Sequence, residues 1–364
     1  MGNQVRRQHT VSKFYLRGFA TEKGLISRVA LSGGPRIDMS ITDATVIKDF
    51  YSIELPDRST SDVFERAFSE IEDVASSALR LVVQGRWPLP EEAKQNLALW
   101  IALQHLRSEE IRASQTDMNG MMIRILVGVS GKEALRSHIE RAEGRPVEDQ
   151  ELDEEWRDLT KPGGPDLEPD VTGHLRLALQ LWPRMAAHLA DSHWTLIRFT
   201  KRALVTSDHP VSMAVDENYP EHMGVGIATA DLFTVPLTRR LGLNIQPRIA
   251  LRQYTDDVDG VRDFVVTGTT AFANSMNQQT VNQARRYVYH HPDDELSGRI
   301  HLPAPVDRSR MDTSTGDNMI REEGLFADAD NRAVAEALSP FPGRDGFSLS
   351  DLPWPIPRRR PRRS

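Results

Sequence analysis

Cysteine is absent from this 364-residue chain, which excludes disulfide bonds, thiolate metal sites and cysteine nucleophiles. No apolar run approaches the about 20 residues that span a bilayer, and the first twenty residues carry charges without a continuous apolar core, so we expect no signal peptide. A Walker loop, a dinucleotide glycine fingerprint, a GxSxG elbow and an HExxH motif are all missing. We expect a soluble, cytoplasmic protein with no membrane partner and no nicotinamide, flavin or thiolate-metal cofactor.

Excess positive charge is also lacking, because the net charge is −7. This balance argues against nucleic-acid binding over the whole surface, but a local basic site can still attract an anion. The exception is the tail PWPIPRRRPRRS at residues 353–364, which predicts an exposed, polyproline-like basic extension that can bind an anionic partner. A short solvated charge run is the alternative interpretation.

Hydrophobic periodicity divides the chain into a helical part and a strand part. Residues 24–42 predict two short strands joined by a turn at Gly33-Gly34-Pro35. Helical spacing predicts helices over 61–83, from Pro90 through about 114, and over 174–192. From Trp194 the apolar residues alternate, which predicts a mainly antiparallel sheet followed by a last helix over 270–290. The fold class is therefore α+β: an N-terminal hairpin and a helical bundle packed on this sheet, with a C-terminal helix.

We predict one large domain over residues 1–303. A polar, acidic insertion near 140–170 contains the breaker Lys161-Pro162-Gly163-Gly164-Pro165. Residues 304–364 are weakly periodic and rich in glycine and proline, which predicts an irregular extension that ends in the basic tail.

Several segments resemble one family of bacterial proteins, the domain-of-unknown-function 4238 (DUF4238) family. The opening motif QHTVSKFYLRGFA is similar to the histidine-aromatic-Tyr-Leu-Arg-x-Phe signature of that family, although Thr10-Val11-Ser12 stands where the family has an aromatic residue and a proline. The resemblance covers roughly residues 5–290 and implies no reaction, because the family has none assigned. The other matching segments are the glutamate-containing helix around Asp62 to Glu72, WIALQHLRSE (100–109), LVTSDHPV (204–211), FTVPLTRRLGL (233–243) and the asparagine-bearing last helix.

Polar groups interrupt two of the predicted helices. Glu65 and Glu72 are seven residues apart, so they lie on one side of the first helix, beside its apolar stripe. Gln104 and Arg107 are three apart on an otherwise apolar helix. A buried arginine needs a partner, which Glu72, Glu65 or Asp208 can supply. Such a pair can be catalytic, or it can simply fix the register of two packed helices.

The stretch TSDHP at 206–210 places polar groups at the end of a predicted strand, where binding sites are often built. Asp208 could orient a histidine, bind a metal or activate water. Alternatively it caps a turn before Pro210.

The opening segment carries candidate groups of its own. His9 suits a general base or a ligand, and Arg17 suits a phosphate or carboxylate. An extended conformation would place Lys13, Tyr15 and Arg17 on one side, with His9 on the side of Arg17. A purely structural histidine is the alternative for His9.

The sequence favours an enzyme-like pocket for an anionic substrate, with hydrolysis of a phosphodiester or nucleotide by a bacterial defence or toxin nuclease as the specific hypothesis. A divalent metal remains open. The alternative is a non-catalytic sensor or interaction protein whose buried polar groups are structural. The expected catalytic residues are His9, Asp208 and Glu72, and the expected substrate-binding residues are Tyr15, Arg17, Gln104 and Arg107.

Overall fold

The computed structural model describes residues 7–48, 50–51, 53–54, 60–61, 63–219, 225–296, 300–303, 320–324, 349 and 352–358, with the side chains of 53–54, 60–61 and 63–67 excepted. Two compact units are formed, one by Met1–Arg112 with Val171–Val306 and the other by Ala113–Asp170 with Asp307–Ser364. Of the tail predicted to be exposed at 353–364, Ile356 is instead buried in the core of the second unit and Arg358 pairs with Glu155, while the residues beyond Arg358 lie outside the described residues. The side chain of Glu65 lies outside them as well. In the part that is described, no helix combines the length and the apolar character needed to cross a membrane.

A five-stranded sheet forms the centre of the first unit, in the order β12-β7-β11-β10-β9. All neighbours pair antiparallel except β12, which runs parallel to β7. The α+β class and the mainly antiparallel sheet predicted from the sequence are therefore confirmed. The strands are β7 (His193–Phe199), β9 (Ser212–Ala214), β10 (Leu232–Thr238), β11 (Leu241–Gln246) and β12 (Phe264–Gly268).

A second, four-stranded sheet has the order β3-β2-β13-β8. It pairs strands from the N-terminal segment of the first unit with strands from its C-terminal segment. The predicted hairpin is present as β2 (Leu25–Ala30) and β3 (Ile37–Ser40). Strand β13 (Tyr287–His290) lies between β2 and β8 (Thr206–Ser207). The predicted last helix over 270–290 is thus too long: α9 (Thr270–Gln283) ends earlier, because the β-branched and aromatic run Tyr287–His290 pairs with β2.

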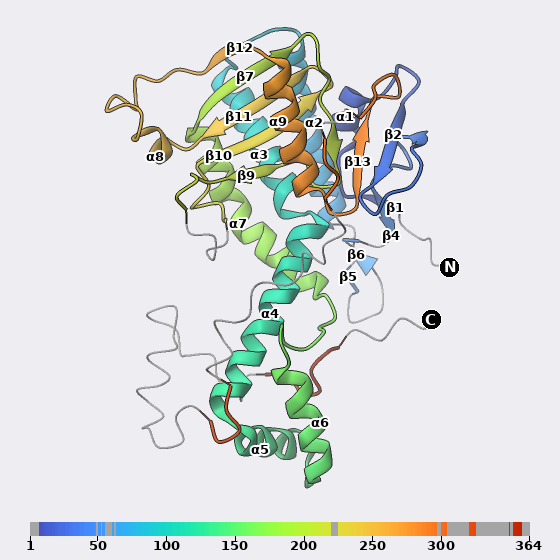
Figure 1. Cartoon of the computed structure of the whole chain (residues 1–364), viewed down its shortest axis with the longest axis vertical. Coiled ribbons are helices and arrows are strands. Elements are labelled where there is room, and N and C mark those ends of the chain that lie inside the picture. Colours follow the sequence, from blue (N-terminus) through green and yellow to red (C-terminus); the bar gives the residue numbers. More distant parts are fainter. Residues whose placement is uncertain are drawn as a thin grey trace. The chain divides into compact units, whose positions relative to one another are not determined.

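Four long helices surround the sheets of this unit. They are α2 (Val63–Val83), α3 (Glu91–Leu106), α7 (Val171–Asp191) and α9. Helix α3 is buried on nearly every side, as its apolar composition predicts. Figure 1 shows α9 in front of the five-stranded sheet and α3 behind it. Helix α9 approaches β11 so closely that a Cβ atom on Gly242 would lie 2.5 Å from Met276.

The alternation of side chains in the opening segment suggested an extended conformation, but the segment forms a short helix. Strand β1 (Arg7–His9) is followed by α1 (Lys13–Leu16) and a single 3-10 turn (Arg17–Phe19). The reason is the spacing of the buried side chains, because Val11, Tyr15, Leu16 and Phe19 fall on one helical face. Lys13 and Arg17 are exposed on the other side.

Short elements complete the first unit. Strand β4 (Val46–Lys48) pairs with β1, and β5 (Ile53–Glu54) pairs with β6 (Thr60–Ser61). Helix α8 (Arg248–Leu251) precedes the loop to β12.

The second unit has a small core of its own. It contains α4 (Glu109–Ser130, in this unit from Ala113), α5 (Lys132–Glu143) and α6 (Asp149–Thr160). The polar stretch at 140–170 includes α6, whose Leu152, Trp156 and Leu159 are buried in this core. Residues 320–324 lie against the turn between α4 and α5. A Cβ atom added to Gly131 in this turn would lie 2.7 Å from the backbone nitrogen of Gly324.

Candidate functional site

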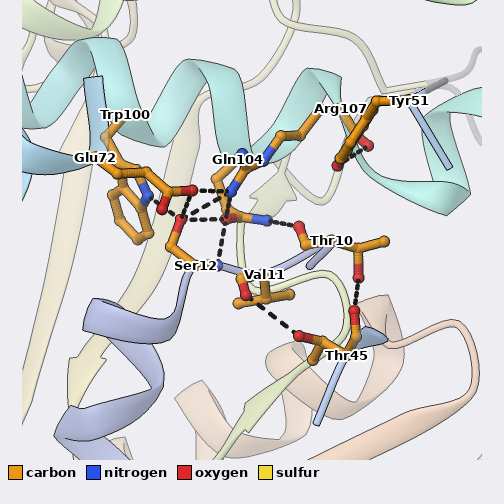
Figure 2. A network of polar contacts seen from close by, with 9 residues as sticks. All are labelled: Thr10, Val11, Ser12, Thr45, Tyr51, Glu72, Trp100, Gln104 and Arg107. Atoms are coloured by element: carbon orange, nitrogen blue, oxygen red, sulfur yellow. Dashed lines mark hydrogen bonds and ion pairs between the residues drawn. The ribbon is translucent and has the colours of Figure 1, made fainter. Parts of the chain in front are cut away.

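A network of buried polar side chains joins the start of α1 to helices α2 and α3 (Figure 2). Trp100, Gln104 and Arg107 follow one another at four- and three-residue spacing, so they lie along one face at the end of α3. Glu72 comes from α2 and Ser12 immediately precedes α1. We call these five residues the Arg107 network.

Ser12 stands at the centre of the Arg107 network. Its hydroxyl accepts hydrogen bonds from Trp100 Nε1 at 2.9 Å and Arg107 Nη2 at 2.8 Å, and donates one to Glu72 Oε1 at 2.8 Å. A serine hydroxyl offers one donor and two acceptor positions, so its capacity is used completely. The side chain is fully buried and does not cap its own helix. This arrangement suits a structural junction and leaves Ser12 unsuited to act as a nucleophile.

Arg107 is 2% exposed and carries the buried positive charge of the network. Its Nη2 donates to Glu72 Oε1 at 2.8 Å and to Gln104 Oε1 at 3.2 Å, and the guanidinium carbon lies 5.4 Å from the centre of the Phe68 ring. Of the carboxylates that the sequence offered as partners, Glu72 pairs with Arg107 and Asp208 lies elsewhere, while the side chain of Glu65 is outside the described residues. The pair offsets the desolvation of the arginine, which would be costly if the charge were alone.

The network also holds the opening segment in place. Gln104 Nε2 donates to the backbone carbonyl of Thr10 at 2.7 Å, and the Thr10 hydroxyl donates to the carbonyl of Thr45 at 3.1 Å. The Thr45 hydroxyl in turn donates to the carbonyl of Val11 at 3.2 Å (Figure 2). Residues 10–12 are therefore fixed between α3 and the loop that precedes β4.

Three titratable side chains lie where this fixed segment meets solvent. Burial and the nearby Lys13 lower the pKa of His9, and hydrogen bonds to the backbone at Thr42 and Ile41, followed by Glu72, partly oppose them, so the imidazole is neutral near pH 7. His9 Nε2 lies 3.1 Å from the carbonyl of Thr42, to which it must donate. Lys13 is exposed, and the side chain of Glu72 is 29% exposed. We call His9, Lys13 and Glu72 the accessible rim.

Tyr15 and Arg17, both predicted to bind substrate, are not part of this arrangement. The Tyr15 hydroxyl is buried, where it donates to the carbonyl of Pro236 at 2.6 Å and lies 2.7 Å from the hydroxyl of Thr206. Burial raises its pKa, so it stays protonated. Arg17 is exposed on the 3-10 turn. Tyr15 therefore connects α1 to the two sheets.

Asp208 occupies a separate position at the start of β13. Its carboxylate accepts hydrogen bonds from the backbone nitrogens of Arg285, Arg286 and Tyr287 at 2.8, 2.8 and 3.0 Å. Burial raises the pKa of Asp208 to about 6, and these three bonds oppose the shift. Within the described residues no hydrogen bond or ion pair joins it to the Arg107 network. These donors lie at the start of β13 and not in a turn before Pro210, so the carboxylate holds the start of a distant strand.

The sequence did not predict Ser12, Trp100 or the pair of His105 and His209 as part of this region. Ser12 and Trp100 belong to the Arg107 network, and the α3 spacing of Trp100, Gln104 and Arg107 was a usable signal for the tryptophan. A buried pair, His105 and His209, places Nδ1 and Nε2 3.0 Å apart, and nothing in the sequence links these two positions. Among the described residues, no group of three or more histidine, aspartate and glutamate side chains is placed to hold a metal ion.

Replacing Ser12 with alanine is expected to lower the free energy of unfolding by about 1–3 kcal/mol, because Trp100 Nε1 loses its acceptor in a buried environment. Chemical denaturation measures the change. Ser32→Ala, at an exposed position in the β2–β3 turn, is the matched control and should change little. Equal stability of the two variants would contradict a structural role for the Ser12 hydroxyl.

Comparison with known proteins gives one match. The model of a family described as protein of unknown function (DUF4238) matches residues 7–294. This confirms the resemblance predicted from the sequence motifs, and the matched region includes all of the Arg107 network and the accessible rim. No curated protein and no solved structure matches the chain.

Proposed function

Because this chain belongs to the DUF4238 family, whose description names no reaction, we propose its function from the geometry of the accessible rim: hydrolysis of a phosphoester such as a phosphodiester or a nucleotide. The observation that carries the proposal is the placement of a neutral imidazole, a carboxylate and an ammonium group at one solvent boundary, on backbone held rigid by the buried Arg107 network.

Each rim group has a chemical role in this proposal. His9, neutral near pH 7, accepts the proton of an attacking water as that water adds to phosphorus. Glu72 stabilises the imidazolium that forms, and Lys13 neutralises the phosphoryl oxygens. The ester P–O bond breaks and the leaving oxygen takes the proton back from His9. Glu72 is well suited to its role because Arg107 and Ser12 fix one of its oxygens.

The other predicted site residues take different roles. Gln104 and Arg107 are positioning residues, since they are buried and bind the groups that hold the rim. Arg17 lies four residues after Lys13 on the same exposed side, so it extends the positive surface available to a longer anion. Tyr15 and Asp208 maintain the sheets on which the opening segment packs.

A non-catalytic sensor or interaction protein is the second candidate. The full use of the Ser12 hydroxyl favours it, because a saturated buried network is what a purely structural junction needs. In that case the rim would bind an anionic ligand without turning it over.

Hydrolysis of bis(4-nitrophenyl) phosphate, with and without Mg²⁺ or Mn²⁺, separates the two candidates. We expect His9→Gln to lower the rate by about 10²–10⁴-fold, because it removes the group that accepts and returns the proton. Glu72→Gln should also lower the rate, because it removes the negative charge that stabilises the imidazolium. His9→Gln should unfold at nearly the wild-type temperature, since His9 reaches solvent. Glu72→Gln should unfold at a lower temperature, because it leaves the buried Arg107 without its carboxylate partner, so the rates are compared well below both unfolding transitions. Glu70→Gln, at an exposed position on the same helix, is the matched control.

Two results would contradict the hydrolase proposal. One is a wild-type rate equal to the uncatalysed background under all these conditions. The other is a Glu72→Gln variant as active as Glu70→Gln. Either would favour the non-catalytic candidate.

A further inference from the structure

The five-stranded sheet ends in a strand that is unusually open. Among the described strands, β12 pairs with β7 alone, and it forms one edge of the sheet. Phe264 and Val265 are 48% and 43% exposed, and Thr267 is exposed as well. At the first residue, Trp87 Nε1 donates to the carbonyl of Phe264 at 2.8 Å.

This edge lacks the features that normally prevent pairing with another strand. The sequence Phe264–Gly268, FVVTG, contains no proline, no lysine and no other charge, and its pairing with β7 runs in register without a bulge. The edge strands of proteins that stay monomeric usually carry such features. The β-branched and aromatic composition instead favours addition of a strand.

The β12 sequence is complementary to itself in one antiparallel register. Pairing centred on Val266 places Val265 opposite Thr267 of a second copy, and Phe264 opposite Gly268. A β-branched pair is favourable across strands, and an aromatic ring covers an edge glycine well. On this face Gly268 already lies against the ring of Phe199, because a Cβ atom there would be 2.1 Å from it, and Phe264 of the second copy would pack beside that ring.

The charges at the two ends of β12 also suit this antiparallel pairing. Because β12 runs parallel to β7, the loop at 255–263 lies at one end of the edge and the end of β7 at the other. The loop carries three exposed aspartates, of which Asp259 pairs with Arg248, beside the exposed Arg262. The end of β7 and the residues after it carry basic side chains, of which Arg198 and Lys201 are exposed and Arg202 is half-buried. An antiparallel pairing brings each acidic end onto the basic end of the other copy. The acidic residues are Asp256, Asp257 and Asp259, and the basic ones are Arg198, Lys201 and Arg202.

We propose that β12 is a dimerisation edge, at which a second copy of this chain adds its own β12 antiparallel, centred on Val266, to give a ten-stranded sheet across a two-fold axis. The proposal is independent of the hydrolase function. A five-residue strand pair buries less than a standard interface, so the dimer is expected to dissociate in the micromolar range and to weaken as salt screens the end charges.

Single cysteines test the register directly, because the chain has none of its own. Residue 266 faces its own counterpart, with Cα atoms about 4.5–5.5 Å apart, which is within the disulfide range. Val266→Cys should therefore form a cross-linked dimer on mild oxidation. Val265→Cys is more exposed but lies about 7–8 Å diagonally from its counterpart, so it should cross-link only when mixed with Thr267→Cys.

Two further variants separate edge pairing from random collision and from general surface effects. Tyr254→Cys, 71% exposed and outside the strand, should not cross-link. Val265→Lys should abolish the concentration-dependent rise in mass measured by sedimentation, whereas Ile249→Lys on α8 should not. A monomeric mass for the wild type at every concentration, or cross-linking of Val265→Cys alone in place of Val266→Cys, would overturn the proposal.

Discussion

Arg107→Ala is expected to lower the free energy of unfolding by about 3–5 kcal/mol, the range found when one partner of a buried ion pair is removed. The substitution removes one of the two donors to the Ser12 hydroxyl and the arginine donor to Gln104 Oε1, and it opens a cavity beside Phe68. Glu72 contributes less to the loss, because its carboxylate is partly solvated. The opening segment should loosen first, since the Arg107 network is what holds it.

Denaturant unfolding followed by tryptophan fluorescence measures this effect, because Trp100 is itself a member of the network. Arg86→Ala is the matched control: this arginine is exposed just after α2, and its loss should change stability by no more than about 0.5 kcal/mol. If both variants unfold at the same denaturant concentration, the buried charge of Arg107 contributes nothing to the fold, and the structural role argued for the network is wrong.

Between pH 6 and 4, two buried groups should change stability in opposite directions. Burial, with His209 beside it, lowers the pKa of His105 to about 3. In this pH range the folded protein therefore does not bind a proton at His105, whereas the unfolded chain binds one below the ordinary histidine pKa of 6.5. Stability from His105 is thus lost as the pH falls. Asp208 has its pKa raised to about 6 by burial, so the folded protein binds a proton that the unfolded chain takes up only near 3.8. Stability from Asp208 is gained over the same window. Each slope is about 1.4 kcal/mol per pH unit.

Single substitutions should reveal the two slopes separately. Relative to the wild type, Asp208→Asn should lose about 2–3 kcal/mol of stability on going from pH 6 to 4, and His105→Asn should gain a similar amount. Denaturant unfolding at half-unit pH steps gives both differences, and the other titrating groups cancel in the comparison. Parallel stability curves for the wild type and both variants would show that neither group titrates as its burial implies.

Periodicity was a sound guide to the main elements of the fold. The change from helical spacing to alternation at Trp194 located the start of the large sheet, although β7 and β10 are buried on both faces and their alternation is therefore incomplete. The same signal failed at Tyr287–Tyr289, where a strand follows α9 after three residues. Its partner β2 lies far away in the sequence, and such a contact leaves no local pattern.

The candidate site was predictable where polar residues interrupt an apolar helix. Gln104 and Arg107 could not be buried without partners, and Glu72 was the carboxylate beside the apolar stripe of α2. Asp208 could not be assigned in this way, because its partners are backbone nitrogens of residues 285–287, and backbone groups are the same in every sequence. Tyr15 was expected on the side of Lys13 and Arg17 but is buried on the opposite side, because the segment that carries it is helical and not extended.

The central place of β13 in the four-stranded sheet has a consequence for synthesis on the ribosome. Strand β2 is complete at Ala30, but the neighbour that completes its pairing begins at Tyr287, about 250 residues later. At about 5–20 residues per second, one edge of the nascent N-terminal hairpin stays unpaired for roughly 12–50 seconds. Nascent chains of this protein should therefore depend on chaperones that cover an exposed strand, until the last strand of the first unit has left the exit tunnel.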